Sequence, residues 1–156
     1  MRPLPELTPE NEFFWTSGAD GSLRFQYCTS CERYAHPPGP VCPLCGGELE
    51  IRSVSGRATV VGFTVNHQPW LPEMPPPYVI ALVAIDDDPL VRLTTLIVDA
   101  EPDTVCIGLP VEGRFEQHED VGLPVFVPTG DAPSDRLDWP EPATAPVRTP
   151  VSTEKF

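Results

Sequence analysis

Four of the five cysteines form two C-x-x-C pairs that are ten residues apart: Cys28, Cys31, Cys42 and Cys45. Two such pairs can place four thiolates at the corners of a tetrahedron, as structural zinc sites do. Gly46 follows the second pair, where the chain must turn back and where glycine permits positive φ. Glu32 stands at the matching position after the first pair. The spacing predicts a rubredoxin-like zinc ribbon that holds one structural zinc ion through four cysteine ligands.

Two disulfides or a thioredoxin-like redox pair are the other interpretations of these cysteines. Disulfides form in oxidising compartments, and residues 1–6 lack the apolar segment of a secretory signal. A redox motif does not need a second C-x-x-C at this distance. We therefore expect a zinc protein in the cytoplasm. Cys106, between Val105 and Ile107, is expected to pack as a small apolar residue.

Composition excludes several other classes of protein. The chain has 22 prolines in 156 residues, and proline disrupts helix interiors, so a mainly helical fold is excluded. The longest apolar run covers residues 79–85, far short of the roughly 20 residues that span a bilayer as a helix. The net charge is −13 with a single lysine, Lys155. Such a charge opposes binding to nucleic acids and to anionic membranes.

A short helix is predicted over residues 8–17, within an N-terminal segment of residues 1–19. Thr8 suits the N-cap, Pro9 suits the first helical position, and Gly18 would end the helix. Three aromatic residues follow one another in this helix: Phe13, Phe14 and Trp15. They either pack on the core of the chain or meet a partner, because exposed aromatic clusters mark interfaces.

The ribbon is expected over residues 20–50 and a β-barrel over residues 51–128. Alternating apolar residues and turn signals predict five strands, at 57–67, 78–86, 90–98, 110–117 and 123–127. Five short strands are typical of a Greek-key barrel of the OB type, and an SH3-like barrel is the alternative. Gly56 and Gly62 permit a bend or bulge in the first strand. Four residues of that strand are expected on one side: Thr59, Val61, Phe63 and Val65.

The loop of residues 66–77 joins the first two barrel strands and contains five prolines. In an OB barrel this loop borders the usual binding face, although it could also be a connector folded over the barrel end. Residues 129–156 are rich in proline and poor in aliphatic residues, so an extended or disordered tail is expected. The predicted contacts with a partner or ligand are Phe13, Phe14, Trp15, His67, Trp70, Leu71, Met74 and Trp139.

The order of these parts resembles a zinc-ribbon plus OB-fold family of acyl-CoA-associated proteins, long known as a domain of unknown function. The resemblance covers about residues 8–128 and is specific as a set. Besides the four cysteines, the matching segments are Phe14-Trp15, Gly21-Ser22-Leu23, His36-Pro37-Pro38, Pro43 and Gly46, Ser55–Val60, Thr64-Val65, Pro77-Tyr78 and Ile107–Val111.

The resemblance implies an accessory subunit that is no enzyme on its own. Members of that family bind thiolase-superfamily enzymes: thiolases, synthases that build hydroxymethylglutaryl-CoA, and aldolases that cleave sterol side chains. It implies a hetero-oligomer, which we expect to hold two copies of each chain, and an acyl-CoA ester whose pantetheine arm the small subunit can line. The residues agree, since we recognise no nucleophile paired with a base and no open metal site. The alternative is a nucleic-acid-binding ribbon and OB-fold protein, against which the acidic charge weighs.

Overall fold

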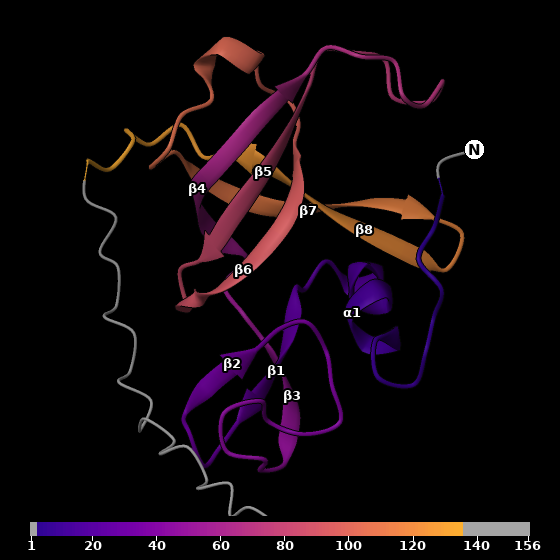
Figure 1. Cartoon of the computed structure of the whole chain (residues 1–156), viewed down its shortest axis with the longest axis vertical. Helices are drawn as coiled ribbons and strands as arrows, with labels where there is room; N and C mark the ends of the chain where they lie inside the picture. The colour runs from indigo at the N-terminus through magenta and orange to yellow at the C-terminus, as the bar shows by residue number, and fades with distance from the viewer. Residues whose placement is uncertain (1–2, 136–156) are drawn as a thin grey trace, which may run out of the picture.

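The structure is a computed structural model and describes residues 3–135. Trp139 therefore lies outside the described residues. A small ribbon sheet and the helix α1 (Glu12–Thr16) lie at one end of a β-barrel. Figure 1 shows the three parts, with the ribbon below the barrel and α1 beside the ribbon. In the described part of the chain, no helix is long and apolar enough to cross a membrane.

Helix α1 begins four residues later than the sequence predicts. Residues 9–11 form a turn, and Asn11 is the N-cap of α1. The backbone N–H of Thr8 donates a hydrogen bond to Asn11 Oδ1 at 2.8 Å, and the N–H of Asn11 donates to the Thr8 carbonyl at 3.1 Å. These bonds close the turn ahead of the helix. The prediction of Thr8 as N-cap and Pro9 as first helical residue is therefore wrong.

Gly18 does not end the helical segment, contrary to the prediction. It lies inside a 3-10 turn, Ser17–Asp20, and the left-handed residue that ends this turn is Gly21, with φ +75°. A Cβ on Gly18 would lie only 2.8 Å from the ring of Phe115. Glycine is needed here because the turn approaches the barrel so closely.

The ribbon is a three-stranded antiparallel sheet in the order β2-β1-β3. Its strands are β1 (Arg24–Cys28), β2 (Arg33–Ala35) and β3 (Leu49–Ser53). Strand β1 leads directly into the first pair of cysteines and ends at Cys28. Leu23 and Phe25 are buried at 3% and 0% exposure and join the core of the barrel.

The barrel is closed by five strands in the order β4-β5-β6-β8-β7. All neighbours pair antiparallel except β6 and β8, which pair parallel at Ile97 and Phe126. This order is a Greek key of the OB type and confirms the predicted barrel. The strands are β4 (Arg57–Asn66), β5 (Tyr78–Ile85), β6 (Asp88–Ile97), β7 (Pro110–His118) and β8 (Val121–Pro128).

Strand β4 carries a bulge between Val60 and Gly62, as the glycine predicts. Before the bulge, Ala58 and Val60 face the core at 1% and 0% exposure. The extra residue reverses the alternation, so residues on the two sides of the bulge do not share a face. The prediction of a common face is therefore wrong for Thr59, Val61, Phe63 and Val65.

The turn between β5 and β6 is shorter than predicted and consists of Asp86 and Asp87 alone. Asp88 and Pro89 belong to β6. The Asp88 carboxylate accepts two hydrogen bonds from the guanidinium of Arg33, at 2.8 and 2.7 Å, and one from the backbone N–H of Tyr34. The start of β6 is thereby fixed to β2 of the ribbon.

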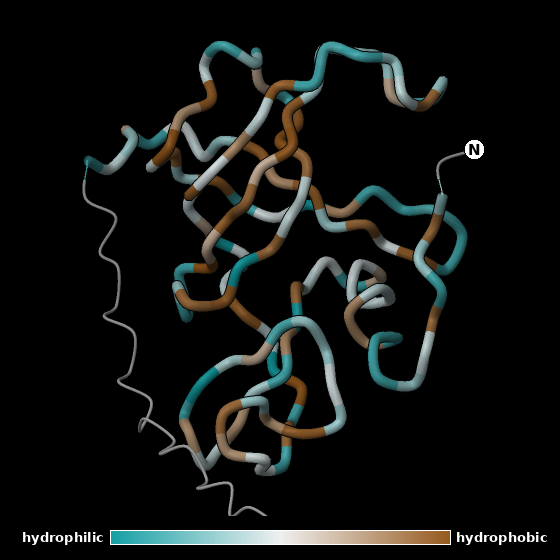
Figure 2. The backbone as a smooth tube through the Cα atoms, in the orientation of Figure 1, coloured by the Kyte–Doolittle hydropathy of each residue, from teal (hydrophilic) through white to brown (hydrophobic). Residues whose placement is uncertain are grey.

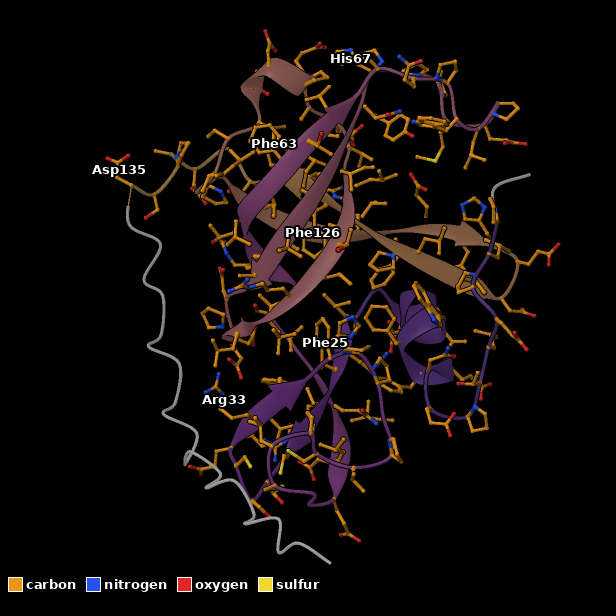
Figure 3. All side chains as sticks on the ribbon, in the orientation of Figure 1. Phe25, Arg33, Phe63, His67, Phe126 and Asp135 are labelled. Carbon is orange, nitrogen blue, oxygen red and sulfur yellow. The ribbon has the colours of Figure 1, made fainter. Side chains whose placement is uncertain are left out.

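Ribbon, helix and barrel share one hydrophobic core. Phe14, Leu23 and Phe25 belong to the same buried cluster as the inward residues of the barrel, including Phe126. Figure 3 shows Phe25 where ribbon and barrel meet and Phe126 within the barrel. Figure 2 shows apolar residues recurring along the barrel strands, whereas the ribbon loops are more mixed.

Candidate functional site

The four cysteine sulfurs of the two knuckles converge on one point. Their Sγ atoms all lie within 4.8 Å of one another. Cys28 and Cys45 Sγ are 3.6 Å apart, and Cys31 and Cys42 Sγ are 4.0 Å apart. Zinc–sulfur bonds of about 2.3 Å in a tetrahedron place sulfurs at about these separations. The four residues therefore fit one zinc ion with a closed set of ligands.

The backbone of both knuckles supports this arrangement. In the second knuckle, the Gly46 N–H donates to the Cys42 carbonyl at 2.8 Å, and the Cys42 N–H donates to the Gly47 carbonyl at 2.9 Å. Gly46 has φ +74°, the conformation that glycine adopts without strain. Glu32 takes the corresponding place in the first knuckle with φ +54°. The missing glycine there changes neither the turn nor the position of the ligands.

The electrostatics of the cluster call for a cation. The hydrogen bond from the backbone N–H of Cys45, helped by that of Leu44, lowers the pKa of the Cys42 thiol to about 7. The hydrogen bond with Cys45, together with burial and the bond with Cys28, raises the pKa of the Cys31 thiol to about 12. Four sulfurs this close cannot all ionise in isolation, and a divalent ion offsets their mutual repulsion.

An apolar groove lies on the barrel face formed by β5 and β6; we call it the barrel groove. It measures about 370 Å³ and lies beside the loop of residues 66–77. In an OB barrel, this face and this loop form the usual binding surface. The Thr95 hydroxyl donates to the Pro124 carbonyl at 2.8 Å and ties β6 to β8 here. The lining residues are Trp15, Met74, Tyr78, Ile80, Leu93, Thr94, Thr95, Leu96, Leu123 and Pro124.

A second cavity lies beside the barrel groove, toward the ribbon; we call it the ribbon cavity. It measures about 450 Å³ and is lined by α1 and by residues 36–40 of the ribbon. Trp15 and Leu93 line both spaces. The two spaces therefore adjoin at these two residues, where ribbon, helix and barrel meet.

The three predicted aromatic contacts of the N-terminal helix differ in how deeply they are buried. Phe14 is 1% exposed and contacts Phe25, at 5.7 Å between ring centroids. The Phe14 ring lies in the core and also borders the ribbon cavity, so its contact with a partner or ligand stays a prediction. Phe13 and Trp15 are partly buried against that core. Of the three, Trp15 lines both cavities.

The predicted contacts of the loop also differ in their positions. Met74 lines the barrel groove, and Leu71 is half-buried. Trp70 is 72% exposed, and its indole N–H donates to Asn66 Oδ1 at 3.0 Å. His67 is exposed where the loop leaves β4, as Figure 3 shows. The loop thus brings Met74 to Trp15 and presents Trp70 to solvent.

Sequence analysis missed the groove residues that come from the strands, such as Tyr78, Ile80 and Leu96. A signal for them exists in β5, where Val79, Ala81 and Val83 fill the core while the intervening residues are also apolar. A strand that is apolar on both faces is expected to be covered on both. The unbroken apolar run at residues 79–85 indicates such a face.

The charges of the described residues bear on what this surface can bind. Residues lining the two cavities include neither lysine nor arginine among those described. Several described arginines form ion pairs with carboxylates of the chain: Arg24, Arg33, Arg52, Arg57 and Arg114. The surface is therefore suited to uncharged apolar groups rather than to phosphates.

Comparison with known proteins gives the same two-part pattern. The family described as "ChsH2, rubredoxin-like zinc ribbon domain" matches residues 15–50, and "ChsH2, C-terminal OB-fold domain" matches residues 52–116. The solved structure "Ltp2-ChsH2(DUF35) aldolase" contains a chain that is 34% identical, with a TM-score of 0.72. The match covers 80% of this chain and 98% of that chain. This chain belongs to the ChsH2 family of DUF35 proteins.

Two curated relatives of this ChsH2-type chain are longer proteins. The "Probable enoyl-CoA hydratase alpha subunit" of Thermomonospora curvata is 35% identical over 130 residues, which is 82% of this chain and 40% of the relative. The "3-oxo-4,17-pregnadiene-20-carboxyl-CoA hydratase alpha subunit" of Mycobacterium tuberculosis is 32% identical over 126 residues, 80% of this chain and 39% of the relative. The ChsH2-type chain thus spans about two fifths of each relative.

Proposed function

We propose that this chain is a non-catalytic accessory subunit of a thiolase-superfamily enzyme that acts on acyl-CoA. The observation that carries the proposal is the surface around Trp15 where the barrel groove and the ribbon cavity adjoin, to which a ribbon loop, α1 and the OB-fold face contribute. The similarity to the ChsH2 chain of an aldolase supports it. We propose that the partner covers this surface and that the complex holds two copies of each chain.

The preferred setting is the cleavage of steroid side chains by a retro-aldolase. One relative is named for the hydration of a pregnadiene carboxyl-CoA and a solved relative for an aldolase. A retro-aldolase acts on the product of such a hydration, because it needs a β-hydroxy acyl-CoA. A thiolase partner would cover the same surface of this chain. The partner would then determine which reaction the complex catalyses.

The contribution of the chain to the CoA ester would be limited to its uncharged part. CoA carries phosphates at one end, and phosphate binding calls for arginine, lysine or helix N-termini. The lining of the barrel groove offers Thr95, Tyr78 and apolar side chains instead. We propose that the groove borders the pantetheine arm or acyl group and that the partner binds the phosphates.

Nucleic-acid binding is the alternative function of a ribbon joined to an OB fold. Single strands bind such folds through a positive groove and stacking rings. The net charge of −13 and the absence of lysine and arginine from the described lining both oppose this function. A gel-shift measurement with single-stranded DNA and RNA is expected to show no complex.

Trp70 provides the sharpest test of the proposed interface. Trp70 is 72% exposed, so Trp70→Ala should leave the melting temperature and zinc content unchanged. Truncating a tryptophan hot spot costs about 2 kcal/mol, which weakens a complex roughly 30-fold. The measurement is the affinity of the chain for an Ltp2-type aldolase, by isothermal titration calorimetry.

Ile107→Ala serves as the matched control, because Ile107 is 54% exposed and lies outside the loop of residues 66–77 that borders the barrel groove. It should bind as tightly as the parent chain. Equal binding by Trp70→Ala and the parent would remove Trp70 from the interface. For Trp139, we propose a partner contact that deletion of residues 136–156 tests in the same assay.

A further inference from the structure

The outer strand of the ribbon has an edge that nothing in the described residues covers. In the sheet order β2-β1-β3, the β2 edge is held against the barrel by the ion pair of Arg33 and Asp88. Strand β3 pairs with β1 alone within the described part of the chain. Its central residue Ile51 is 52% exposed. A free edge with an exposed aliphatic residue is a template for another strand.

Hydrogen bonds to β1 fix which backbone groups of β3 face this edge. The Val54 N–H donates to the Leu23 carbonyl at 2.9 Å. Hydrogen-bonded and non-hydrogen-bonded pairs alternate along an antiparallel ladder. With the register of β1 and β3, the backbone groups of Glu50 and Arg52 face β1. Those that face outward belong to Leu49, Ile51 and Ser53.

The residues of β3 are complementary to themselves in one antiparallel register. When two copies pair about Ile51, Leu49 meets Ser53 and Glu50 meets Arg52 of the other copy. Registers centred on Glu50 or Arg52 place like charges opposite each other, which is unfavourable. Only the register about Ile51 brings opposite charges together while the outward backbone groups also meet.

We propose that two copies of this chain associate through their β3 edges, antiparallel about Ile51, to form a six-stranded ribbon sheet. Ile51 exchanges two backbone hydrogen bonds with its counterpart, and each pairing of Leu49 with Ser53 exchanges two more. Glu50 and Arg52 then form non-hydrogen-bonded pairs, in which side chains lie closest. Glu50 and Arg52 form an ion pair within one chain, and both side chains remain accessible to the other copy, at 48% and 44% exposure.

The association is weak because each copy contributes a strand of five residues. Stable interfaces bury roughly 800 Å² on each partner, more than such a strand provides. A complex that already holds two copies would strengthen the contact by raising their effective concentration. The inference concerns the free chain and does not depend on the proposed function.

Sedimentation velocity of the zinc-loaded full chain, from about 10 µM to about 1 mM, tests the proposal. The parent chain is expected to form dimers as the concentration rises. Glu50→Arg places arginine opposite arginine, and Arg52→Glu places glutamate opposite glutamate. Each single variant should weaken the dimer about tenfold or more. The double variant Glu50→Arg/Arg52→Glu restores both pairs and should dimerise like the parent.

Arg114→Glu is the matched control. Arg114 and Glu112 form a similarly spaced, exposed pair on β7, which belongs to the barrel and pairs with β8 along residues 111–118 and with β4 at residues 110–112. This variant should dimerise like the parent. Zinc content and melting temperature establish that each variant folds. A parent chain that stays monomeric throughout the range overturns the proposal, as does a double variant that remains as weak as the single ones.

Discussion

The ribbon and the barrel differ in what stabilises them. The barrel closes its ring of strands around most of the buried cluster, so apolar burial supports it. The ribbon places Leu23 and Phe25 in that cluster, while four of the five residues of β3 are exposed. A sheet with so little core of its own depends on metal and on its neighbour. Zinc and the contacts at the junction therefore determine the shape of the surface on which we propose that a partner binds.

The junction between the two regions has an apolar part and an ionic part. The His36 ring contacts both Phe14 and Phe25, with centroids 5.0 and 5.2 Å away. The ion pair of Arg33 and Asp88 lies on another side of the junction. Burial raises the pKa of Asp88, but hydrogen bonds from Arg33, Leu90 and Tyr34 outweigh burial, and the net pKa is lowered.

Loss of zinc should produce the largest difference in stability between the ribbon and the barrel. Structural zinc contributes about 10 kcal/mol or more to folding, comparable to the whole stability of a domain. Cys42→Ser should therefore lose metal and the ribbon fold, which metal analysis and thermal melts would measure. Cys106→Ser, outside the metal centre, should keep both. A Cys42→Ser chain that retains the ribbon fold without zinc would contradict the claim that the ribbon depends on the metal.

Local patterns predicted the parts of the molecule that local physics decides. The cysteine spacing identified the metal centre, and alternation placed each barrel strand within a few residues. The start of α1 depends on the hydrogen bonds between Thr8 and Asn11. Helix-capping preferences do not decide between Thr8 and Asn11 as the N-cap, because both residue types are favoured there. Burial of Phe14 and assembly of the groove from α1, β5, β6, β8 and a loop depend on tertiary contacts. A single sequence does not show such contacts.

Removing Arg33 should loosen the junction while leaving zinc in place. The Asp88 side chain is 8% exposed, so Arg33→Ala leaves a buried carboxylate without its ion partner. We expect a loss of about 2 kcal/mol, below the usual range for a buried pair because Arg33 is partly exposed. Chemical denaturation measures this change. Arg57→Ala, which breaks the exposed pair with Asp131, should change stability far less, because solvent screens an exposed ion pair.

Acid should weaken the junction through His36. Burial lowers the pKa of His36 to about 4, whereas an unfolded histidine has a pKa near 6.5. The unfolded chain therefore takes up a proton that the folded chain refuses between these values, and stability falls as the pH drops from 6.5 toward 4. Between pH 7 and pH 5, His36 should account for about 2 kcal/mol of this loss.

His36→Phe, which keeps a ring against Phe14 and Phe25, should lose less stability over that interval than the parent. His36→Gln gives a second variant without a titrating group. Denaturation at the two pH values measures the difference, and acid effects on zinc cancel in the comparison. Equal losses in the parent and both variants would show that His36 does not link the junction to pH.

The dependence of turnover on a partner tests the central claim most directly. The isolated zinc-loaded chain is assayed with β-hydroxy acyl-CoA esters of steroid side chains, alone and then with an Ltp2-type aldolase. We predict no turnover by the chain alone and turnover by the complex, lowered by Trp70→Ala at limiting concentrations. Substantial turnover by the isolated chain would contradict the account of a non-catalytic subunit.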